Sequence, residues 1–341
     1  MKTALLFAGQ GAQAVGMGQD LASAFPAARA LMDRANAVLG YDLARICFEG
    51  PEDELTRTEN AQPGIYLISW VALALLKERV PGLSFEATAG LSLGEFTALA
   101  AAGVMTFEEG LQVVRARGRF MHEACEQTRG GMAALIGLDE AATREVCEAA
   151  GVTLANLNCP GQIVISGELD RVPPRSNTAR RAAPAKAIPL TVASAYHSPL
   201  MASAQPSSPP PWPAFPSRRR GFPLIADNTA QPHGGPDILA CLLAGGPGHP
   251  CGPLGGFDRW LLDPGLHPLH RTGARHALTY LRSTSTRTQV PPSRTSQSGG
   301  NGGSAEGIVV ISRGHWPVVI GPSSRLSSCV KGREFWCGTS H

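Results

Sequence analysis

Residues 89–95 read Ala-Gly-Leu-Ser-Leu-Gly-Glu, a stretch that places Ser92 inside a G-x-S-x-G motif. The preceding residues 85–89 can form a short strand, and residues 95–102 have the small, apolar character of a buried helix. A serine on such a sharp strand-to-helix turn is exposed at the helix N-terminus, as a serine nucleophile must be. The motif also occurs at ordinary glycine-bounded turns, but the strand and helix around it favour a nucleophile.

A second glycine-rich turn lies near the start of the chain. Residues 5–13 read Leu-Leu-Phe-Ala-Gly-Gln-Gly-Ala-Gln, which predicts an apolar strand that runs into a turn. Taken alone, this segment is an ordinary strand-to-loop connection. Taken together with the Ser92 turn, it suggests that the backbone N–H groups of Gln10 and Leu93 form a pair of donors for an oxyanion.

Further segments accompany these two turns. Their order and spacing agree with those of one protein family over residues 1–171 and, in patches, to about residue 282. They are Thr-Glu-Asn-Ala-Gln-Pro at 58–63, Arg-Ala-Arg-Gly-Arg-Phe-Met at 115–121, Gly-Gly-Met-Ala-Ala at 130–134, Asn-Leu-Asn-Cys-Pro-Gly-Gln-Ile-Val-Ile-Ser-Gly at 156–167 and Ala-Tyr-His-Ser-Pro-Leu-Met at 195–201. With them the chain resembles the malonyl-CoA:acyl carrier protein transacylases, an acyltransferase family of fatty acid synthesis. The family usually has histidine where this chain has Leu91, and leucine cannot form that residue's hydrogen bonds.

The resemblance implies a catalytic dyad, with Ser92 as nucleophile and His197 as general base. In such an acyl-carrier-protein S-malonyltransferase, malonyl-CoA esterifies the serine, and the phosphopantetheine thiol of acyl carrier protein then takes the malonyl group. Arg117 matches the family's carboxylate-binding arginine, whose planar guanidinium can hold malonate through two parallel hydrogen bonds. The further substrate-binding positions that the resemblance implies are Gln62, Asn158 and Gln162. No cofactor is implied, because malonyl-CoA is a substrate.

Without the resemblance, the same residues have plainer interpretations. Arg117, together with Arg115 and Arg119, would belong to a solvated basic helix face, and His197 would be a surface or packing residue. A serine esterase would share G-x-S-x-G, but it normally adds an acidic residue between serine and histidine and has no use for a carboxylate-binding arginine. A third alternative is an inactive product of a disrupted transacylase gene, able at most to bind coenzyme A or the carrier protein.

The expected fold class is α/β. Helical periodicity over residues 20–39, 65–78 and 107–125 accompanies the two predicted strands. The resemblance implies a hydrolase-like large domain with a parallel sheet, built from residues 1–125 and 196–282, and an inserted ferredoxin-like α+β small domain over residues 126–195. Residues 283–341 are expected to be a low-complexity or non-native tail that is disordered.

Charge and proline content divide the chain into two unlike parts. Residues 1–171 hold 21 of the 27 carboxylates and 5 of the 28 prolines, and their net charge is −8, whereas residues 172–341 hold 23 prolines and have a net charge of +11. With permitted codons, a one-base shift turns residues 266–276 into Phe-Thr-Arg-Phe-Ile-Glu-Leu-Gly-Pro-Gly, which contains the family's F-x-E-x-G-P-G signature. The same shift turns residues 251–258 into Ala-Val-Arg-Trp-Glu-Ala-Ser, similar to the family's P-V-x-W segment. We therefore interpret the basic half as locally shifted in reading frame, not as a nucleic-acid-binding tail.

Composition and motifs make several classes of function unexpected. Hydrophobic residues make up 43% of the chain, enough for a sizeable core, but no apolar run reaches the roughly 18 residues of a membrane span. The eight cysteines contain no C-x-x-C pair, which favours reduced thiols in the cytoplasm. His267 and His270 have a metal-like spacing but lie in the shifted stretch, so no metal site is expected. We expect a cytoplasmic monomer whose partners are malonyl-CoA and acyl carrier protein, with no nucleic acid and no membrane.

Overall fold

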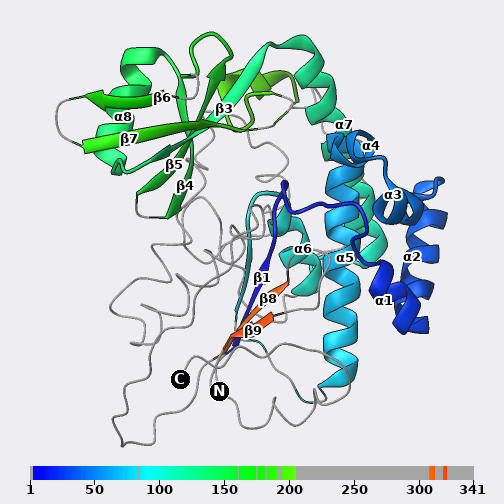
Figure 1. Cartoon of the computed structure of the whole chain (residues 1–341). Coiled ribbons are helices and arrows are strands. Elements are labelled where there is room, and N and C mark those ends of the chain that lie inside the picture. Colours follow the sequence, from blue (N-terminus) through cyan, green and yellow to red (C-terminus); the bar gives the residue numbers. More distant parts are fainter. Residues whose placement is uncertain are drawn as a thin grey trace, which may run out of the picture.

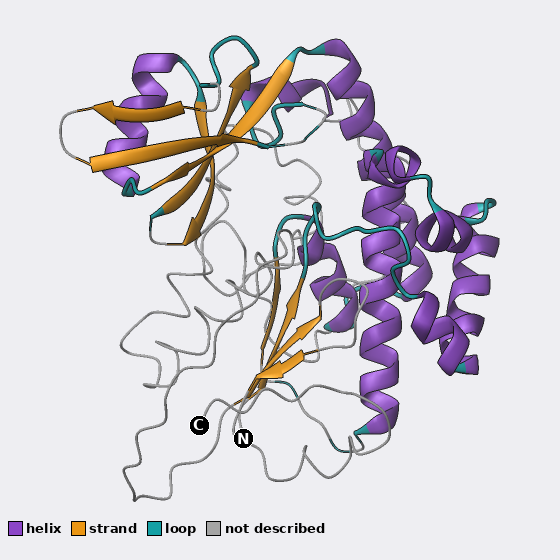
Figure 2. Cartoon of the chain, viewed as in Figure 1, coloured by secondary structure: helices purple, strands orange, loops and turns teal. Residues whose placement is uncertain are grey.

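In the computed structural model, the described part of the chain comprises residues 3–80, 82, 85, 87–159, 161–173, 176–180, 183–190, 192, 194–204, 307–311 and 318–320. These residues form two sheets and the helices around them (Figures 1 and 2). The expected return of the chain to the large domain spans residues 196–282, of which residues 205–282 lie outside the described part. The two segments interpreted as shifted in reading frame, 251–258 and 266–276, lie outside it as well.

The first sheet carries the two glycine-rich turns. Its strand order is β2-β1-β8-β9. β1 (Thr3–Phe7) is parallel both to β2 (Ala87–Gly90) and to β8 (Gly307–Ile311), and β9 (Val318–Ile320) is antiparallel to β8. Because β1 and β2 run in the same direction, their carboxyl ends meet at one edge of the sheet, where each strand continues into its turn.

β8 and β9 differ from the expectation of a disordered tail over residues 283–341. The two strands are the runs Gly-Ile-Val-Val-Ile and Val-Val-Ile. Branched aliphatic side chains favour extended backbone, and β1 can pair with a strand on the side that β2 does not occupy. Short apolar runs therefore enter the sheet even though most of their surroundings in the sequence are polar and glycine-rich.

Helices pack beside the first sheet. They are α1 (Gln19–Ala24), α2 (Pro26–Leu39), α3 (Leu43–Glu49), α4 (Glu52–Thr56), α5 (Thr58–Arg79), α6 (Leu93–Ala101) and α7 (Phe107–Gln127). α5 is buried over much of its length and packs on α7, where the ring of Tyr66 stacks with that of Phe107 and its hydroxyl donates to the Phe107 carbonyl at 3.1 Å. The helix expected over residues 20–39 is split because Pro26 starts a new helix, a position that suits proline.

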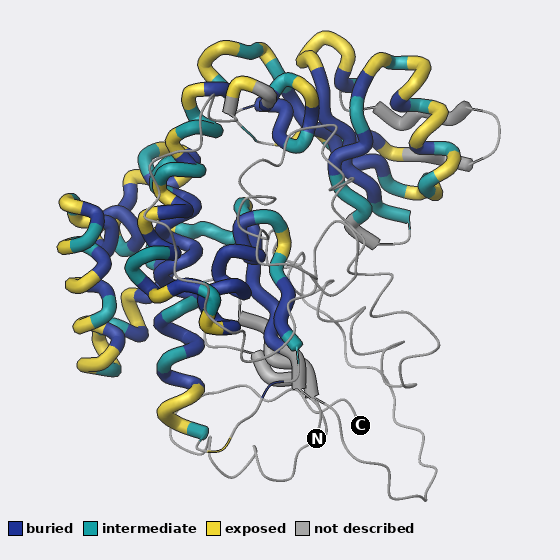
Figure 3. The backbone as a smooth tube through the Cα atoms, turned by 180° about the vertical axis from the view of Figure 1, so that it is seen from behind, coloured by how far each residue is buried: buried dark blue, intermediate teal, exposed yellow. Residues whose placement is uncertain are grey.

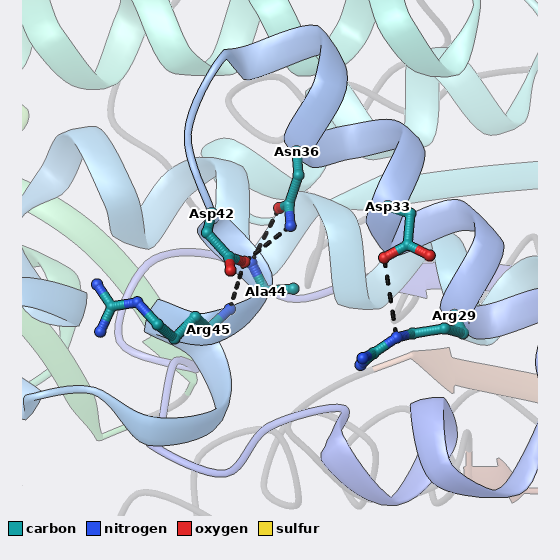
Figure 4. A network of polar contacts seen from close by, with 6 residues as sticks. All are labelled: Arg29, Asp33, Asn36, Asp42, Ala44 and Arg45. Atoms are coloured by element: carbon teal, nitrogen blue, oxygen red, sulfur yellow. Dashed lines mark hydrogen bonds and ion pairs between the residues drawn. The ribbon is translucent and has the colours of Figure 1, made fainter.

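Polar side chains fix the corner between α2 and α3 (Figure 4). Asp42 Oδ1 accepts hydrogen bonds from the Arg45 backbone N–H at 2.9 Å and from Asn36 Nδ2 at 2.7 Å. Asn36 Oδ1 in turn accepts from the Ala44 backbone N–H at 3.1 Å. Two of the N–H groups at the start of α3 are thereby satisfied by side chains, which is what an N-cap requires.

The second sheet is antiparallel, with the order β4-β5-β3-β7-β6. Its strands are β3 (Gly130–Ile136), β4 (Thr153–Cys159), β5 (Gln162–Glu168), β6 (Ser176–Arg180) and β7 (Ala183–Pro189), and α8 (Glu140–Ala150) lies between β3 and β4 in the chain. Alternate residues of β3 enter different clusters. Ala133 and Leu135 belong to one that includes the α8 residue Cys147, and Met132 and Ala134 to one that includes Tyr196. Figure 3 shows the resulting buried strands between more exposed helices and loops.

The chain leaves β7 through residues 190–198 and enters a short 3₁₀ helix, η1 (Pro199–Ala204). η1 packs on α7, and Met201 joins Tyr196 and the α7 residue Ala124 in one apolar cluster. His197, the predicted base, lies just before η1 in the chain. The packing of η1 on α7 therefore holds His197 near the helices beside the first sheet.

Candidate active site

Ser92 lies on a strained turn between β2 and α6. Its backbone has φ 49° and ψ −96°, outside the conformations that non-glycine residues normally adopt. Within the part of the chain that the structure describes, Ser92 and His197 (φ 59°) are the only non-glycine residues with positive φ. Such conformations persist only where the surrounding structure holds them, and they are concentrated at functional sites.

Close packing against β1 explains the glycines of this turn. The Leu91 backbone N–H donates to the Phe7 carbonyl at 3.1 Å, so the elbow is joined directly to the end of β1. A Cβ on Gly94 would overlap the Phe7 carbonyl, and one on Gly90 would overlap the backbone of Gly94. A Cβ on Gly9 would come within 2.5 Å of the Leu91 carbonyl oxygen. The two glycine-rich turns are therefore in contact.

The geometry at the start of α6 suits the proposed donor Leu93. As the first residue of the helix, Leu93 has a backbone N–H with no acceptor in a preceding helical turn. The following N–H groups, of Gly94 and Glu95, are turned back to the carbonyls of Leu91 and Ser92 at 2.8 and 3.2 Å. Leu91 itself, where the family usually has histidine, leaves 40% of its surface exposed beside the nucleophile.

Arg117 extends from α7 to the nucleophile. Its Nη2 donates to Ser92 Oγ at 2.9 Å, and its Nη1 donates to Gln62 Oε1 at 2.9 Å. The guanidinium also lies 5.2 Å from the centre of the Phe96 ring. Burial lowers the pKa of Arg117 to about 10, and the negative charge of Glu95 opposes that shift. Arg117 is therefore positively charged at neutral pH, with its charge directed at the position where a substrate would be attacked.

The neighbours of Arg117 on α7 behave differently. Arg115 donates to the Leu39 carbonyl at 2.8 Å, and Arg119 lies 3.5 Å from the Glu123 carboxylate with most of its side chain exposed. Residues two apart on a helix do not share a face. The alternative of one solvated basic face is therefore wrong for Arg117.

His197 is near enough to Arg117 to be affected by its charge. Burial is the larger cause and the Arg117 guanidinium the smaller one, and together they lower the pKa of His197 to about 3. The side chain nevertheless keeps part of its surface accessible. The imidazole is consequently neutral at physiological pH, the form that a general base needs. An acidic residue paired with the histidine, as in an esterase triad, would raise this pKa instead.

The predicted substrate-binding residues fall into two groups. Gln62 is fully buried and is held between Arg117, Gln10 and Met121, donating to Gln10 Oε1 at 3.3 Å and to Met121 Sδ at 3.2 Å. Gln162 begins β5 and is partly exposed. Asn158 lies in β4, and its side chain is outside the described part. The structure thus brings Gln62 and Gln10 to Ser92 and Arg117, whereas the other two belong to the second sheet.

Glu95 is a member of the site to which the sequence analysis assigned no role. It is 4% exposed, in the first turn of α6, and its charge acts on Arg117. The sequence signal that could have identified Glu95 is its carboxylate within an otherwise apolar helix. A buried acidic residue is rarely found without a partner.

Two negative observations apply to the described residues only. No group of three or more His, Cys, Asp or Glu side chains is arranged there to hold a metal ion. Nor is any helix in that part long and apolar enough to cross a membrane.

Comparison with known proteins shows which family the chain resembles. A family model described as the acyl transferase domain matches residues 4–209. The malonyl CoA-acyl carrier protein transacylase of Bacillus subtilis (strain 168) is 45% identical over 208 residues, 60% of this chain and 65% of that protein. The protein of the same name from Staphylococcus aureus (strain MRSA252) is 32% identical over 285 residues, 82% of this chain and 91% of that protein.

A solved structure is similar as well. It is a type II polyketide acyl-carrier protein in complex with its malonyl-transacylase, with a TM-score of 0.65 and 29% identity over 77% of this chain and 84% of that one. The chain spans slightly less than two thirds of the Bacillus subtilis protein, but the family model covers more than half of the chain. On this match and the long alignment with the Staphylococcus aureus protein, the chain belongs to the acyl transferase family that includes the malonyl CoA-acyl carrier protein transacylases.

Proposed function

We propose that the chain transfers the malonyl group of malonyl-CoA to the phosphopantetheine thiol of acyl carrier protein, through a malonyl ester on Ser92. The observation that carries this proposal is the 2.9 Å hydrogen bond between the Arg117 guanidinium and the Ser92 hydroxyl. It places a cation in contact with the proposed serine nucleophile, and the charge of that cation also acts on a histidine that stays neutral. A thioester whose acyl group ends in a carboxylate fits this arrangement.

In the first half-reaction, Ser92 Oγ attacks the thioester carbonyl while the imidazole of His197 accepts the hydroxyl proton. In this proposal the backbone N–H groups of Gln10 and Leu93 stabilise the oxyanion. The tetrahedral intermediate collapses with cleavage of the C–S bond, and the imidazolium returns the proton to the coenzyme A thiolate. The second half-reaction repeats these steps in reverse, with the carrier protein's thiol as the attacking group.

Arg117 has a second role in this proposal, in the free enzyme. Its hydrogen bond to Ser92 Oγ occupies a lone pair of the nucleophile and lowers its reactivity. A malonyl carboxylate competes for the same guanidinium and would draw it away from the serine. An acetyl group offers no such competitor, so this exchange adds to the selectivity for malonyl.

The relatives support the choice of an acyl carrier protein as acceptor. The names of the two sequence relatives and of the solved complex mention an acyl carrier protein as the partner. We further propose that the first sheet with its helices is the hydrolase-like large domain and that the antiparallel sheet with α8 is the ferredoxin-like inserted domain. We also propose that the protein acts in the cytoplasm as a monomer, without a cofactor.

Incubation with malonyl-CoA followed by peptide mass analysis tests the proposal. The peptide that contains Ser92 should gain one malonyl group, and Ser92→Ala should abolish the modification. Modification of a different peptide would show that the nucleophile lies elsewhere.

A further inference from the structure

Two hydroxyl groups, of Thr58 and Tyr196, continue the hydrogen bonds of the site beyond the residues that the proposed reaction uses. Gln10 Nε2 donates to Thr58 Oγ1 at 3.4 Å, and Thr58 Oγ1 lies 2.9 Å from Tyr196 Oη. Together with the bonds of Gln62, they form a chain of hydrogen bonds from Arg117 to Tyr196, which we call the relay.

The chemistry of Arg117 sets the direction of the relay as far as Thr58. A guanidinium has only donors, so Gln62 must present its carbonyl oxygen to it and its amide nitrogen to Gln10. Gln10 must then present its own oxygen to Gln62 and its nitrogen to Thr58. If either amide group were rotated by half a turn, two hydrogen-bond donors or two acceptors would face each other. One partly buried cation therefore orients both glutamine side chains.

Burial makes this arrangement sensitive to the loss of a single member. The exposed fraction is 1% for Thr58, 0% for Gln62 and 7% for Tyr196. A buried polar group that loses its partner cannot easily be compensated by water, and linked hydrogen bonds polarise one another. Burial also raises the pKa of Tyr196 to about 12, so its hydroxyl keeps its proton.

The relay connects the parts of the site that must act together. At one position it includes Gln10, whose backbone is part of the proposed oxyanion site. Its last member is Tyr196, which directly precedes His197 in the chain. The backbone of His197 has the strained φ of 59°. Thr58 is the first residue of α5, so the bond to Tyr196 also ties the segment that follows the second sheet to a helix beside the first.

We propose that Thr58 and Tyr196 are positioning residues, which act through the relay to hold His197 and the Gln10 turn in the geometry needed to acylate Ser92. This inference rests on the proposed function. It predicts that either hydroxyl can be removed without touching the reacting atoms and that the rate of acylation will still fall.

The test measures single-turnover acylation of Ser92 by malonyl-CoA in the full chain with Tyr196→Phe, Thr58→Val, both together, and Thr58→Ser. Each of the first two should lower the maximal rate about tenfold with little change in the malonyl-CoA concentration for half-maximal rate. The double variant should be hardly slower than either single one, because both break the same contact. Thr58→Ser retains the hydroxyl and should retain the rate.

Matched controls separate positioning from stability. Tyr66→Phe removes a buried tyrosine hydroxyl that donates to the Phe107 carbonyl at 3.1 Å. Thr143→Val removes a buried threonine hydroxyl that donates to the Asp139 carbonyl at 2.7 Å. Both should lower the melting temperature and leave the acylation rate unchanged.

Two failures can be told apart. A wild-type chain that never acylates Ser92 overturns the proposed function and this inference with it. If the wild type acylates Ser92 but the relay variants behave like the Tyr66→Phe and Thr143→Val controls, the inference alone is wrong. A Thr58→Ser variant as slow as Thr58→Val would also overturn it, because the hydroxyl would then not be the cause.

Discussion

Arg117 influences both Ser92, the proposed nucleophile, and His197, the proposed base. Its guanidinium donates to the Ser92 hydroxyl, and its positive charge contributes to the low pKa of His197. Both effects weaken when a substrate carboxylate neutralises the guanidinium. A dicarboxylic acyl group is thus expected to free the serine and to make the histidine more basic at the moment when a base is needed.

Removal of the guanidinium should change the choice of substrate. In Arg117→Ala, malonyl transfer should lose about 1.5–3 kcal/mol of transition-state stabilisation, the value of a hydrogen bond to a charged group. Acetyl transfer should fall less or even rise, because Ser92 Oγ is released. The measurement is kcat/KM for malonyl-CoA and acetyl-CoA with wild type and variant. Equal losses for both substrates would mean that Arg117 is structural.

The low pKa of His197 should appear in the pH dependence of stability. The ordinary pKa is 6.5 and that of the folded state is about 3. Between these values the unfolded chain binds a proton that the folded chain does not, so the free energy of unfolding decreases as the pH falls from 6.5 towards 3 and is unaffected above 6.5. The free energy of unfolding, measured with urea at about pH 7.5 and about pH 5, should therefore decrease more for wild type than for His197→Gln.

Carboxylates titrate in both wild type and His197→Gln. Comparing the two proteins therefore removes the contribution of the carboxylates to the pH dependence of the free energy of unfolding. Identical losses for wild type and His197→Gln would show that His197 titrates near its ordinary pKa and is not held in the buried position next to Arg117.

Among the secondary-structure elements, the crossing of α6 over the end of β1 builds the site. The helix starts so close to β1 that Gly94 has no room for a side chain, and it packs so closely on the end of β2 that Gly90 has none either. This approach places the N-terminus of α6 beside the Gln10 turn, and a positive helix end there favours a developing negative charge.

A single methyl group at this crossing should disable the site. Gly94→Ala would place a Cβ against the Phe7 carbonyl, which is backbone and cannot move aside cheaply. We expect a stability loss of roughly 1–3 kcal/mol, as for other overpacked sites, and loss of Ser92 acylation. Thermal unfolding and malonyl labelling measure the two effects.

Gly103→Ala is the matched control for that variant. Gly103 has φ +84° but no atom within 4 Å of an added Cβ, so alanine there suffers only the strain of its backbone, about 1–2 kcal/mol. This variant should be less stable and still acylate Ser92. If Gly94→Ala also acylates normally, the close approach of α6 and β1 is not what forms the site.

At the scale of the whole molecule, the chain combines an acidic first part with a basic, proline-rich second part. The family model ends its match at residue 209, and the alignment with the Bacillus subtilis protein reaches 65% of that protein. The alignment with the Staphylococcus aureus protein is longer, at 285 residues, so a change of reading frame in the second part stays a prediction.

Restoring the frame should therefore improve both activity and stability. We expect a variant chain with the frame restored across about residues 238–276, ending shortly after the recovered Gly-Pro-Gly, to transfer malonyl groups much faster than the chain as written. It should also be more stable, because apolar residues would replace glycine, proline and arginine that cannot fill a core. Equal activity and equal melting curves would show instead that the second part is an authentic, divergent domain.

Local patterns of sequence predicted much of the fold. The strands at the two glycine-rich turns and the helices of residues 65–78 and 107–125 were visible from apolar periodicity, because each buries one or both faces. The break before Pro26 was missed because the periodicity runs through it. β8 and β9 were missed for a different reason: strands this short become stable only when a partner strand is present.

The sequence by itself determined the turn on which Ser92, the proposed nucleophile, lies, since a G-x-S-x-G turn between a strand and a helix depends on neighbouring residues alone. Only the tertiary structure decided that Arg117 turns inward while Arg115 and Arg119 do not, because that depends on which side of α7 packs on α5 and the elbow. It likewise decided the meeting of Thr58 with Tyr196 and the low pKa of His197. These properties arise from burial and from charges far apart in the chain, and no local pattern of residues contains them.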